Sequence, residues 1–516
     1  MKTKYLSILF GGLALMTSVT SCEDDLDIPQ HGVLDYSSYY QTDEQFETAA
    51  NALYLELKGT YYNYTMLKGC LSDDVWSGGG VHGDNAELDG CNEFTFDAEQ
   101  SFIRGVWESY YKIIYKANVV LGHITEGTSP VGDRARAEAK VFRAFAYFDL
   151  ISMWGEPPLV DHELAPAEYS VPNGNPEELW ALVENDLKEA IASGYLAEKS
   201  NADDNTTWRL TKQFAQAMLG KAYLWQNKYS EAAEQFNAVR KSGKYRLYDG
   251  AFEDMLTYKA EYNCESMLES NRIFDANNNM DEFSFYEVMN HWRTDRMTVA
   301  ADIQGTGWGF MCPRKDLYDA FVAEEGVNGY RLTSTMKTYD QLKETGSSIN
   351  AGQTMINEGY FMWKRRFTLE ESKNGFWVSY NNYRWMRYAE VLLLGAEANF
   401  QAGNKSEADA CLNEVRTRAK LSPKSNASLE DIKLEKRLEL CCEYTRFQDL
   451  LRWGEAEARM GKQGEKCPIL NSSGVVTYES YNSDPSKYGF KARHNRLPIP
   501  AVECRLNSAI NQNPGW

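Results

Sequence analysis

Residues 211–226 and 229–242 both carry apolar side chains at helical spacing, and only a very short turn separates them. In the first segment, Leu219, Gly220 and Tyr223 fall close together on one helical face. The second segment continues with apolar residues three or four positions apart: Tyr229, Ala232, Phe236 and Val239. Two helices joined by so short a turn form a hairpin, so this part of the chain is predicted to be α-helical.

The spacing resembles the tetratricopeptide repeat, in which small residues let two helices approach and large ones fill the groove between them. A looser copy has one extra residue in its turn and consists of Leu394, Gly395, Ala398, Ala408, Leu412 and Val415. Helical hairpins are predicted in three regions, at about residues 102–154, 176–242 and 384–453. Stacked helical repeats usually present a surface to a partner.

Two regions break the helical pattern. Residues 71–97 follow a predicted helix at 43–64, are rich in Gly, Asp and Asn, and contain Gly78, Gly79 and Gly80. From about residue 249 to 382 the helical period fades again, and Gly, Asn and aromatic residues dominate. Long loops in compact proteins are usually functional or disordered. We therefore predict a long irregular loop in the first region and a loop-rich, ligand-facing insert with short strands in the second.

The N-terminus has the form of a secretory signal. Lys2 and Lys4 precede an apolar run at 5–16, and small residues lead to Cys22, which an acidic stretch follows. Val19–Cys22 resembles the bacterial lipobox, which implies cleavage before Cys22 and lipidation of that cysteine. The acidic stretch resembles the signal that exports some Gram-negative lipoproteins to the outer cell surface. A soluble secreted protein whose signal happens to contain a cysteine is the alternative.

These segments predict a domain plan. Residues 1–21 form the signal peptide, 22–42 an acidic tether, and 43–516 a single large domain. The formal net charge of −20 argues against nucleic acid or an anionic bilayer surface as a partner. The chain contains 13 Trp and 32 Tyr, a supply of rings that suits stacking on sugar faces. The nine cysteines besides Cys22 leave disulfide pairing open.

Catalytic and metal motifs are missing from the sequence. There is no HExxH, GxSxG or P-loop pattern, and the literal GxGxxG at 78–83 lacks a strand–turn–helix context. Residues 275–281 begin like a calcium loop, but Met280 and Tyr286 occupy the positions that need Gly and Glu. We therefore predict no catalytic residue, no metal ligand and no cofactor, with a structural calcium ion left open. The 74 carboxylates also leave a glycosidase pair open.

Four groups of motifs extend over the mature chain behind the lipobox. They are RAEAKVFRAFAYFDL at 136–150 with WGEPPLV at 154–160, RYAEVLLLGAEAN at 387–399 with NEVRTRA at 413–419, EKRLEL at 435–440 with DLLRWG at 449–454, and LPIP at 497–500 with NQNPGW at 511–516. In this order they resemble the RagB/SusD, or starch-utilisation-system D, family of outer-membrane nutrient-binding lipoproteins. Within the third group, Glu435, Glu439 and Glu443 are spaced by four and are expected to meet arginines such as Arg446 and Arg452.

The resemblance implies a mainly α, SusD-like fold in which tetratricopeptide-like hairpins form a scaffold and irregular loops carry a shallow ligand site. It implies a lipid-anchored protein of the outer membrane that faces the outside of the cell. Such a protein captures oligosaccharides and acts as the lid of a SusC-like TonB-dependent transporter barrel. A peptide-binding member of the family, a scaffolding repeat protein and an extracellular glycan hydrolase remain alternatives.

Two regions match the expected ligand loops by position, and they supply the candidate ligand-binding residues. The glycine-rich loop contributes Trp76, Asn85 and Asn92, and the insert contributes Trp292, Arg293, Trp308 and Trp363. Tryptophan rings stack on sugar faces, while Asn and Arg donate hydrogen bonds to hydroxyls. Trp76 and Trp308 are the favoured stacking residues because glycines beside them offer little cover, although any of these tryptophans is a core residue in the alternative interpretation.

Overall fold

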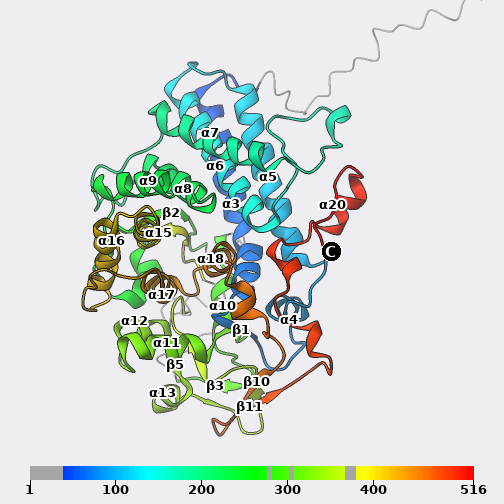
Figure 1. The fold of residues 1–516 in the computed structure, drawn as a ribbon, viewed down its shortest axis with the longest axis vertical. Helices are drawn as coiled ribbons and strands as arrows, with labels where there is room; N and C mark the ends of the chain where they lie inside the picture. Colours follow the sequence, from blue (N-terminus) through cyan, green and yellow to red (C-terminus); the bar gives the residue numbers. More distant parts are fainter. Residues whose placement is uncertain (1–38, 276–281, 301–306, 367–378) are drawn as a thin grey trace, which may run out of the picture. The chain divides into compact units, whose positions relative to one another are not determined.

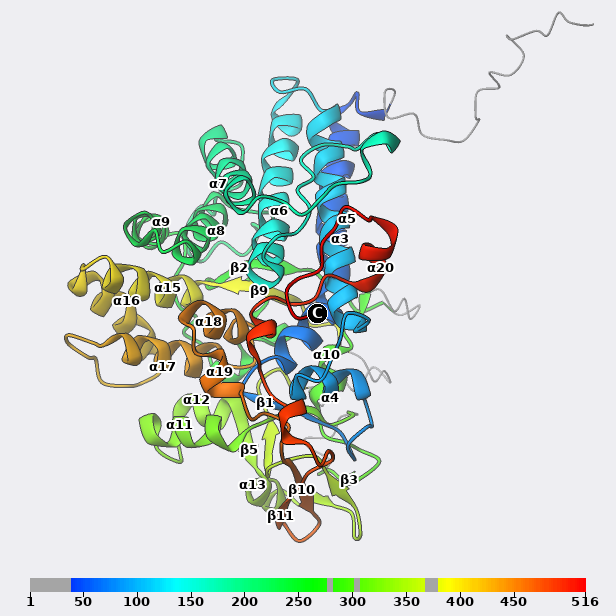
Figure 2. The same cartoon turned by 45° about the vertical axis from the view of Figure 1, so that its right-hand side comes forward.

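Three long helices begin at side-chain caps and lie side by side (Figures 1 and 2). The computed structural model describes residues 39–275, 282–300, 307–366 and 379–516, and the described part of Thr42–Trp516 forms one unit. A capping box at Thr42 starts α3 (Asp43–Cys70), and Ser129 caps α6 (Pro130–Trp154). Between them in the chain is α5 (Ser101–His123), whose start is capped by Gln100.

Further helices occupy the regions where helical spacing predicted hairpins. α7 (Pro176–Ser193) is followed by α8 (Lys212–Trp225) and α9 (Tyr229–Lys241). After the insert come α15 (Tyr388–Gln401), α16 (Lys405–Arg418), α17 (Leu429–Leu440) and α18 (Arg446–Trp453). In both views α9, α15 and α16 follow one another as a stack of helices (Figures 1 and 2).

Phe236 of α9 shows why the two glycines of the repeat pattern are needed. A Cβ atom on Gly220 of α8 would come within 2.8 Å of the Phe236 ring, and a Cβ atom on Gly395 of α15 would come within 3.2 Å of Phe236 Cβ. The ring is 1% exposed. The missing side chains therefore let one large residue pack against two neighbouring helices, as the spacing predicted.

The strands are short, and most of them pair with a strand that is not their neighbour in sequence. β1 (Val75–Gly78) pairs with β4 (Phe310–Pro313), and β2 (Ser266–Ser270) pairs with β9 (Tyr383–Arg387). Two more pairs join β3 (Met297–Thr298) to β6 (Ser348–Ile349) and β5 (Met336–Thr338) to β8 (Tyr360–Met362). β10 (Cys467–Asn471) lies between β11 (Val476–Glu479) and β7 (Thr354–Met355). All these pairs are antiparallel.

Short helices also interrupt the regions predicted to be loops. The insert contains α10 (Tyr286–Asn290), α11 (Lys315–Glu325), α12 (Tyr330–Thr335) and α13 (Tyr339–Glu344). The prediction of irregular structure throughout 71–97 is wrong, because this region holds β1 and α4 (Ala86–Glu93). β1 depends on a partner strand far along the chain, which periodicity does not reveal. The remaining helices of the described residues are α19 (Ala456–Met460), α20 (Ala501–Leu506) and the 3-10 turns Pro166–Glu168, Phe252–Asp254, Tyr258–Ala260, Pro485–Lys487 and Ala492–Asn495.

A buried network of charges joins the insert to the helices that follow it. Glu439 of α17 is 0% exposed and accepts from Arg387 at 2.6 Å and from Arg331 at 3.1 Å, and it also pairs with Arg418. Arg331 lies on α12, Arg387 ends β9 and Arg418 ends α16. Next to it, Glu443 pairs with Arg387 at 2.7 Å. One carboxylate thus connects three separate elements.

The prediction that Arg446 and Arg452 pair with these carboxylates is wrong. Arg446 pairs with Asp73 at 2.7 Å, and Arg452 pairs with Glu397 instead of Glu435, Glu439 or Glu443. Helical spacing places carboxylates on one face but says nothing about which distant segment packs there. The partners come from elements that are remote in sequence.

Acid should weaken this network. Burial opposes ionisation of Glu443, but Arg387 and Lys364 outweigh it and lower the pKa of Glu443 to about 2. An unfolded Glu has a pKa of about 4.3, so this group stabilises the fold above that pH and loses its contribution as pH falls toward 2. We expect Glu443→Gln to lower the free energy of unfolding by about 3 kcal/mol at pH 7, measured by urea denaturation.

The difference between wild type and Glu443→Gln should shrink as the pH falls from about 4.3 toward 2, since the wild-type carboxyl becomes neutral. Glu457→Gln, at an exposed position, is the matched control and should change stability little at any pH. A constant difference across the pH range would contradict the assignment of the acid response to Glu443.

Candidate ligand-binding site

The glycine-rich loop after β1 is fastened to the insert by backbone hydrogen bonds. Gly79 N donates to Gly309 O at 2.7 Å, and Ile356 N donates to Gly79 O at 3.0 Å. Gly78 has a φ of +82°, and a Cβ atom there would come within 2.5 Å of Gly309 O. Only glycine permits this approach in that conformation. The loop and the insert therefore form one continuous surface.

Arg293 connects the two sides of that surface. Its guanidinium pairs with Asp84 of the loop, lies 3.0 Å from the Asp295 carboxylate, and donates from Nη1 to Trp308 O at 3.2 Å. Asp84 Oδ2 also accepts from Gly80 N at 2.9 Å. A cation between two carboxylates holds the loop and the insert together by charge as well as by backbone contacts.

Trp308 has a fixed backbone and an accessible ring. Its N–H donates to Val288 O at 2.8 Å, and the next residue, Gly309, donates to His291 O at 2.8 Å. The side chain is 38% exposed. Among the tryptophans that the structure describes, Trp208 and Trp308 are the two that are exposed rather than buried or half-buried. Part of Trp308 is therefore accessible to solvent.

Asn85 lies next to Asp84 and is half-buried. Its Oδ1 accepts from Leu88 N at 3.2 Å and so caps α4. Within the described parts of the chain its Nδ2 has no acceptor. Three of the predicted residues, Asn85, Arg293 and Trp308, thus belong to the surface where the loop meets the insert. We call the side chains of Asp84, Asn85, Arg293, Asp295 and Trp308 the loop–insert surface.

The structure buries Trp76 and Asn92. Trp76 is 5% exposed because β1 pairs with β4 and the Arg314 guanidinium lies 4.0 Å from the ring centroid. The expectation that glycines would leave Trp76 uncovered is therefore wrong. Asn92 is 1% exposed and donates to Cys70 O at 2.9 Å and to Val75 O at 3.0 Å, which links the end of α3 to β1.

The other two predicted tryptophans are also covered. Trp292 and Trp363 are 2% and 9% exposed, and their ring centroids are 5.6 Å apart in a cluster with Met355 and Leu470. Trp363 Nε1 donates to Glu253 at 3.1 Å. These rings form the core of the insert, so the accessible part of the predicted site is Asn85, Arg293 and Trp308. Ligand contact remains a prediction for all seven residues.

Replacing each of the two favoured tryptophans by alanine should destabilise the protein to a different extent. Trp76→Ala removes a buried ring, and we expect it to lower the free energy of unfolding by about 3–5 kcal/mol. Trp308→Ala should cost less than about 1 kcal/mol because its ring is exposed. Urea denaturation of the two variants measures both values. Equal losses would contradict the burial of one ring and the exposure of the other.

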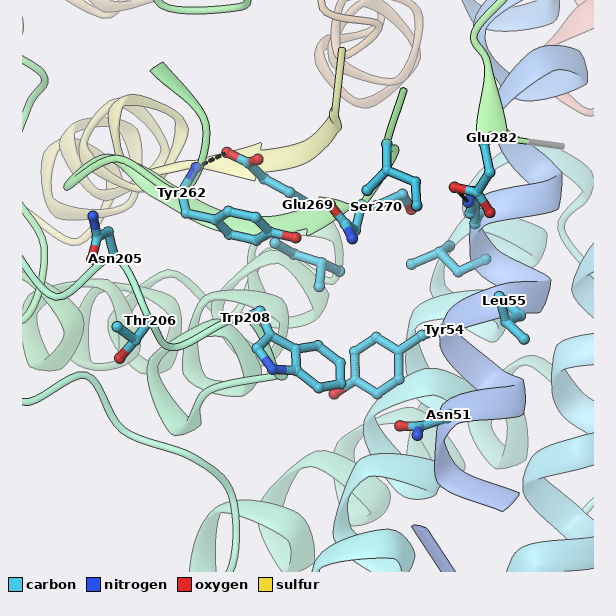
Figure 3. A pocket seen from close by; sticks show the side chains of 15 residues that line it. Asn51, Tyr54, Leu55, Asn205, Thr206, Trp208, Tyr262, Glu269, Ser270 and Glu282 are labelled. Atoms are coloured by element: carbon cyan, nitrogen blue, oxygen red, sulfur yellow. Dashed lines mark hydrogen bonds and ion pairs between the residues drawn. The ribbon is translucent and has the colours of Figure 1, made fainter. Parts of the chain in front are cut away.

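A separate pocket lies between α3, the segment before α8 and β2 (Figure 3). Its volume is about 560 Å³, and Tyr54, Trp208 and Tyr262 line it. Trp208 is 45% exposed and stands edge-on to Tyr54, with ring centroids 5.4 Å apart. The Arg209 guanidinium lies 4.5 Å from the Trp208 ring centroid. None of the seven predicted ligand residues lines this pocket.

Several polar groups of the pocket already have partners within the protein. Glu282 pairs with Lys58 at 2.7 Å, and Glu269 accepts from Tyr262 N at 3.0 Å. Ser270 Oγ accepts from a tryptophan ring nitrogen at 2.7 Å. The pocket therefore presents mainly ring and aliphatic surface. Sequence reasoning missed it, although the polar run at 201–207 before Trp208 was a signal of an exposed ring.

The loop–insert surface lacks the arrangement of a glycosidase. Two carboxylates of such an enzyme face the scissile bond with substrate between them. Here the Arg293 guanidinium contacts both Asp84 and Asp295, so it occupies the position between them. Cys22 and residues 276–281 of the calcium-like pattern lie outside the described residues. No helix in the described part of the chain is long and apolar enough to cross a bilayer.

Comparison with known proteins identifies the family. A model described as the SusD family matches residues 328–516, and a model described as starch-binding and associating with the outer membrane matches residues 33–224. The chain belongs to the SusD family. The family assignment made from the sequence motifs is confirmed.

Curated relatives of this SusD-family protein match along their whole length. SusD-like protein P2 of Formosa agariphila is 25% identical over 98% of both chains. Starch-binding protein SusD of Bacteroides thetaiotaomicron is 22% identical over 100% of both chains. The similarity therefore spans the scaffold and the insert alike.

Solved structures confirm the SusD-like, mainly helical fold. A laminarin-binding SusD-like protein is 27% identical with a TM-score of 0.77, and the match covers 92% of this chain and 100% of that one. Surface glycan-binding protein A of Bacteroides thetaiotaomicron, solved with laminarihexaose, is 21% identical with a TM-score of 0.74 over 92% and 100% of the two chains. The second match supports the fold alone.

Proposed function

We propose that this SusD-family protein is a non-catalytic, cell-surface glycan-binding lipoprotein. It captures oligosaccharides and delivers them to a partner TonB-dependent transporter, over which it acts as a lid. The observation that carries the proposal is similarity to a laminarin-binding SusD-like protein at 27% identity over 92% of this chain. The partner barrel and the anchor follow from the family resemblance and the lipobox-like segment at Cys22.

The proposed glycan site is the loop–insert surface. Trp308 supplies an exposed ring for stacking, and a sugar face on it gains about 1–2 kcal/mol from burial of apolar area, before entropic costs. Asn85 Nδ2 and the Arg293 guanidinium supply donors to sugar hydroxyls, and Asp84 and Asp295 supply acceptors. A surface that combines an accessible ring with donors and acceptors suits the amphipathic surface of a pyranose.

Affinity electrophoresis of the mature protein tests both whether it binds a glycan and where on the protein the glycan binds. We expect one polysaccharide of a panel that includes laminarin and xyloglucan to retard the wild type. Trp308→Ala should weaken retardation about tenfold, since about 1.4 kcal/mol corresponds to a factor of ten. Trp208→Ala, which removes the other exposed ring, is the matched control and should bind like the wild type.

Each other outcome of this experiment has a defined meaning. Loss of retardation in Trp208→Ala but not in Trp308→Ala would move the site to the pocket of Figure 3. Release of reducing sugar would replace the proposal with a hydrolase. Retention of peptides without retention of any glycan would favour the peptide-binding alternative.

Replacement of the lipobox cysteine tests the anchor and its purpose. A Cys22→Ala protein should fail to incorporate an alkyne-labelled fatty acid and should leave the membrane fraction, because no acyl chain holds it. Growth of the source cells on the bound glycan should slow, since delivery requires a lipoprotein held beside its transporter. Normal labelling and membrane retention of Cys22→Ala would contradict the proposed anchor.

A further inference from the structure

Three side chains with metal-binding atoms meet beside the glycine-rich loop. His82 comes from the loop, Glu93 ends α4 and Cys467 begins β10. The imidazole nitrogen, carboxylate oxygen and thiol sulfur all lie within 4.8 Å of one another. His82 Nε2 is 2.8 Å from Glu93 Oε1, and Cys467 Sγ is 3.4 Å from the same oxygen. His82 and Glu93, eleven residues apart in the chain, thus meet a cysteine that is 374 residues from Glu93.

The Glu93 carboxylate at this cluster is paired with His82 and, in the described part of the chain, with no lysine or arginine. Glu93 and Asp89 lie one helical turn apart on α4 and are 6% and 5% exposed. Among the described residues, no lysine or arginine forms an ion pair with either carboxylate. The nearby Arg314 instead stacks on Trp76. Buried carboxylates are normally paired with a cation or bind a metal. A metal ion would therefore be stabilised next to Glu93 and Asp89.

The donor set selects the kind of metal. Sulfur, imidazole nitrogen and carboxylate oxygen together suit Zn²⁺ better than Ca²⁺ or Mg²⁺, which prefer oxygen alone. The His82 side chain is 24% exposed, so water can reach the fourth position of a tetrahedral site. The Tyr481 ring stacks on the His82 imidazole with centroids 4.0 Å apart, which limits the rotation of that ligand.

We propose that His82, Glu93 and Cys467 form a zinc site. Binding replaces the thiol proton of Cys467, which passes to solvent, and breaks the hydrogen bond between His82 and Glu93 so that both bind the metal. Burial and the charge of Glu93 raise the pKa of the Cys467 thiol, so the metal-free cysteine stays protonated. The site would join the glycine-rich loop and α4 to the β10–β11 hairpin.

Cobalt titration of the mature chain, with Cys22 replaced by serine, tests the site. One equivalent of Co²⁺ should give a near-ultraviolet thiolate-to-cobalt band, and Zn²⁺ should abolish it by displacement. The band should disappear in Cys467→Ser, and His82→Ala should weaken cobalt affinity at least tenfold. Cys504→Ser, which changes a partly exposed cysteine elsewhere, is the matched control and should keep the band.

A second measurement uses the wild-type protein, so its result does not depend on whether a variant folds. Zn²⁺ should slow alkylation of Cys467 in the wild type, read by mass spectrometry, while alkylation of Cys504 should keep its rate. Absence of the cobalt band in the wild type, its survival in Cys467→Ser, or unchanged alkylation of Cys467 would each overturn the proposal. Glycan retardation without added metal is a separate readout, so failure of this site leaves the proposed function standing.

Discussion

The buried carboxylate of Glu439 holds the insert and the helical scaffold in one arrangement. Arg331 approaches it from α12 of the insert, Arg387 from β9, and Arg418 from the end of α16. Removing such charges from water costs several kcal/mol per ion, and only a well-formed set of pairs offsets that cost. A displaced element would leave an unpaired buried charge. The network therefore favours a single packing of the insert against the helices.

Helical spacing revealed the scaffold because its contacts are local. Gly220 and Phe236 belong to adjacent helices, and their packing follows from intervals of three and four residues. The partners of Glu439 were not predictable in the same way, since they come from segments that only the folded chain brings together. The same limit applies to β1, which is a strand because β4 lies beside it.

The exposure of the candidate ligand-binding residues was predictable in part, and two tryptophans show the reason. The same local argument, glycine neighbours and little cover, was applied to Trp76 and Trp308. It succeeded for Trp308, whose ring is 38% exposed, and failed for Trp76, which β4 and Arg314 cover. Exposure depends on tertiary neighbours as well as local sequence. A polar context also surrounds Trp208, so the pocket in Figure 3 was open to the same reasoning.

The glycine-rich loop links the two proposed sites, because Asp84 contacts Arg293 while His82 contacts Glu93. Ordering the backbone of one residue costs about 1–2 kcal/mol, and a ligand that orders the loop at one end spares a second ligand part of that cost. Such coupling is reciprocal, so zinc at His82 and a glycan at Asp84 would each favour the other. The backbone bonds from Gly79 to Gly309 and Ile356 already reduce the freedom of the loop, which limits the size of the effect. The glycine-rich loop is thus the element through which the two proposed sites would be coupled.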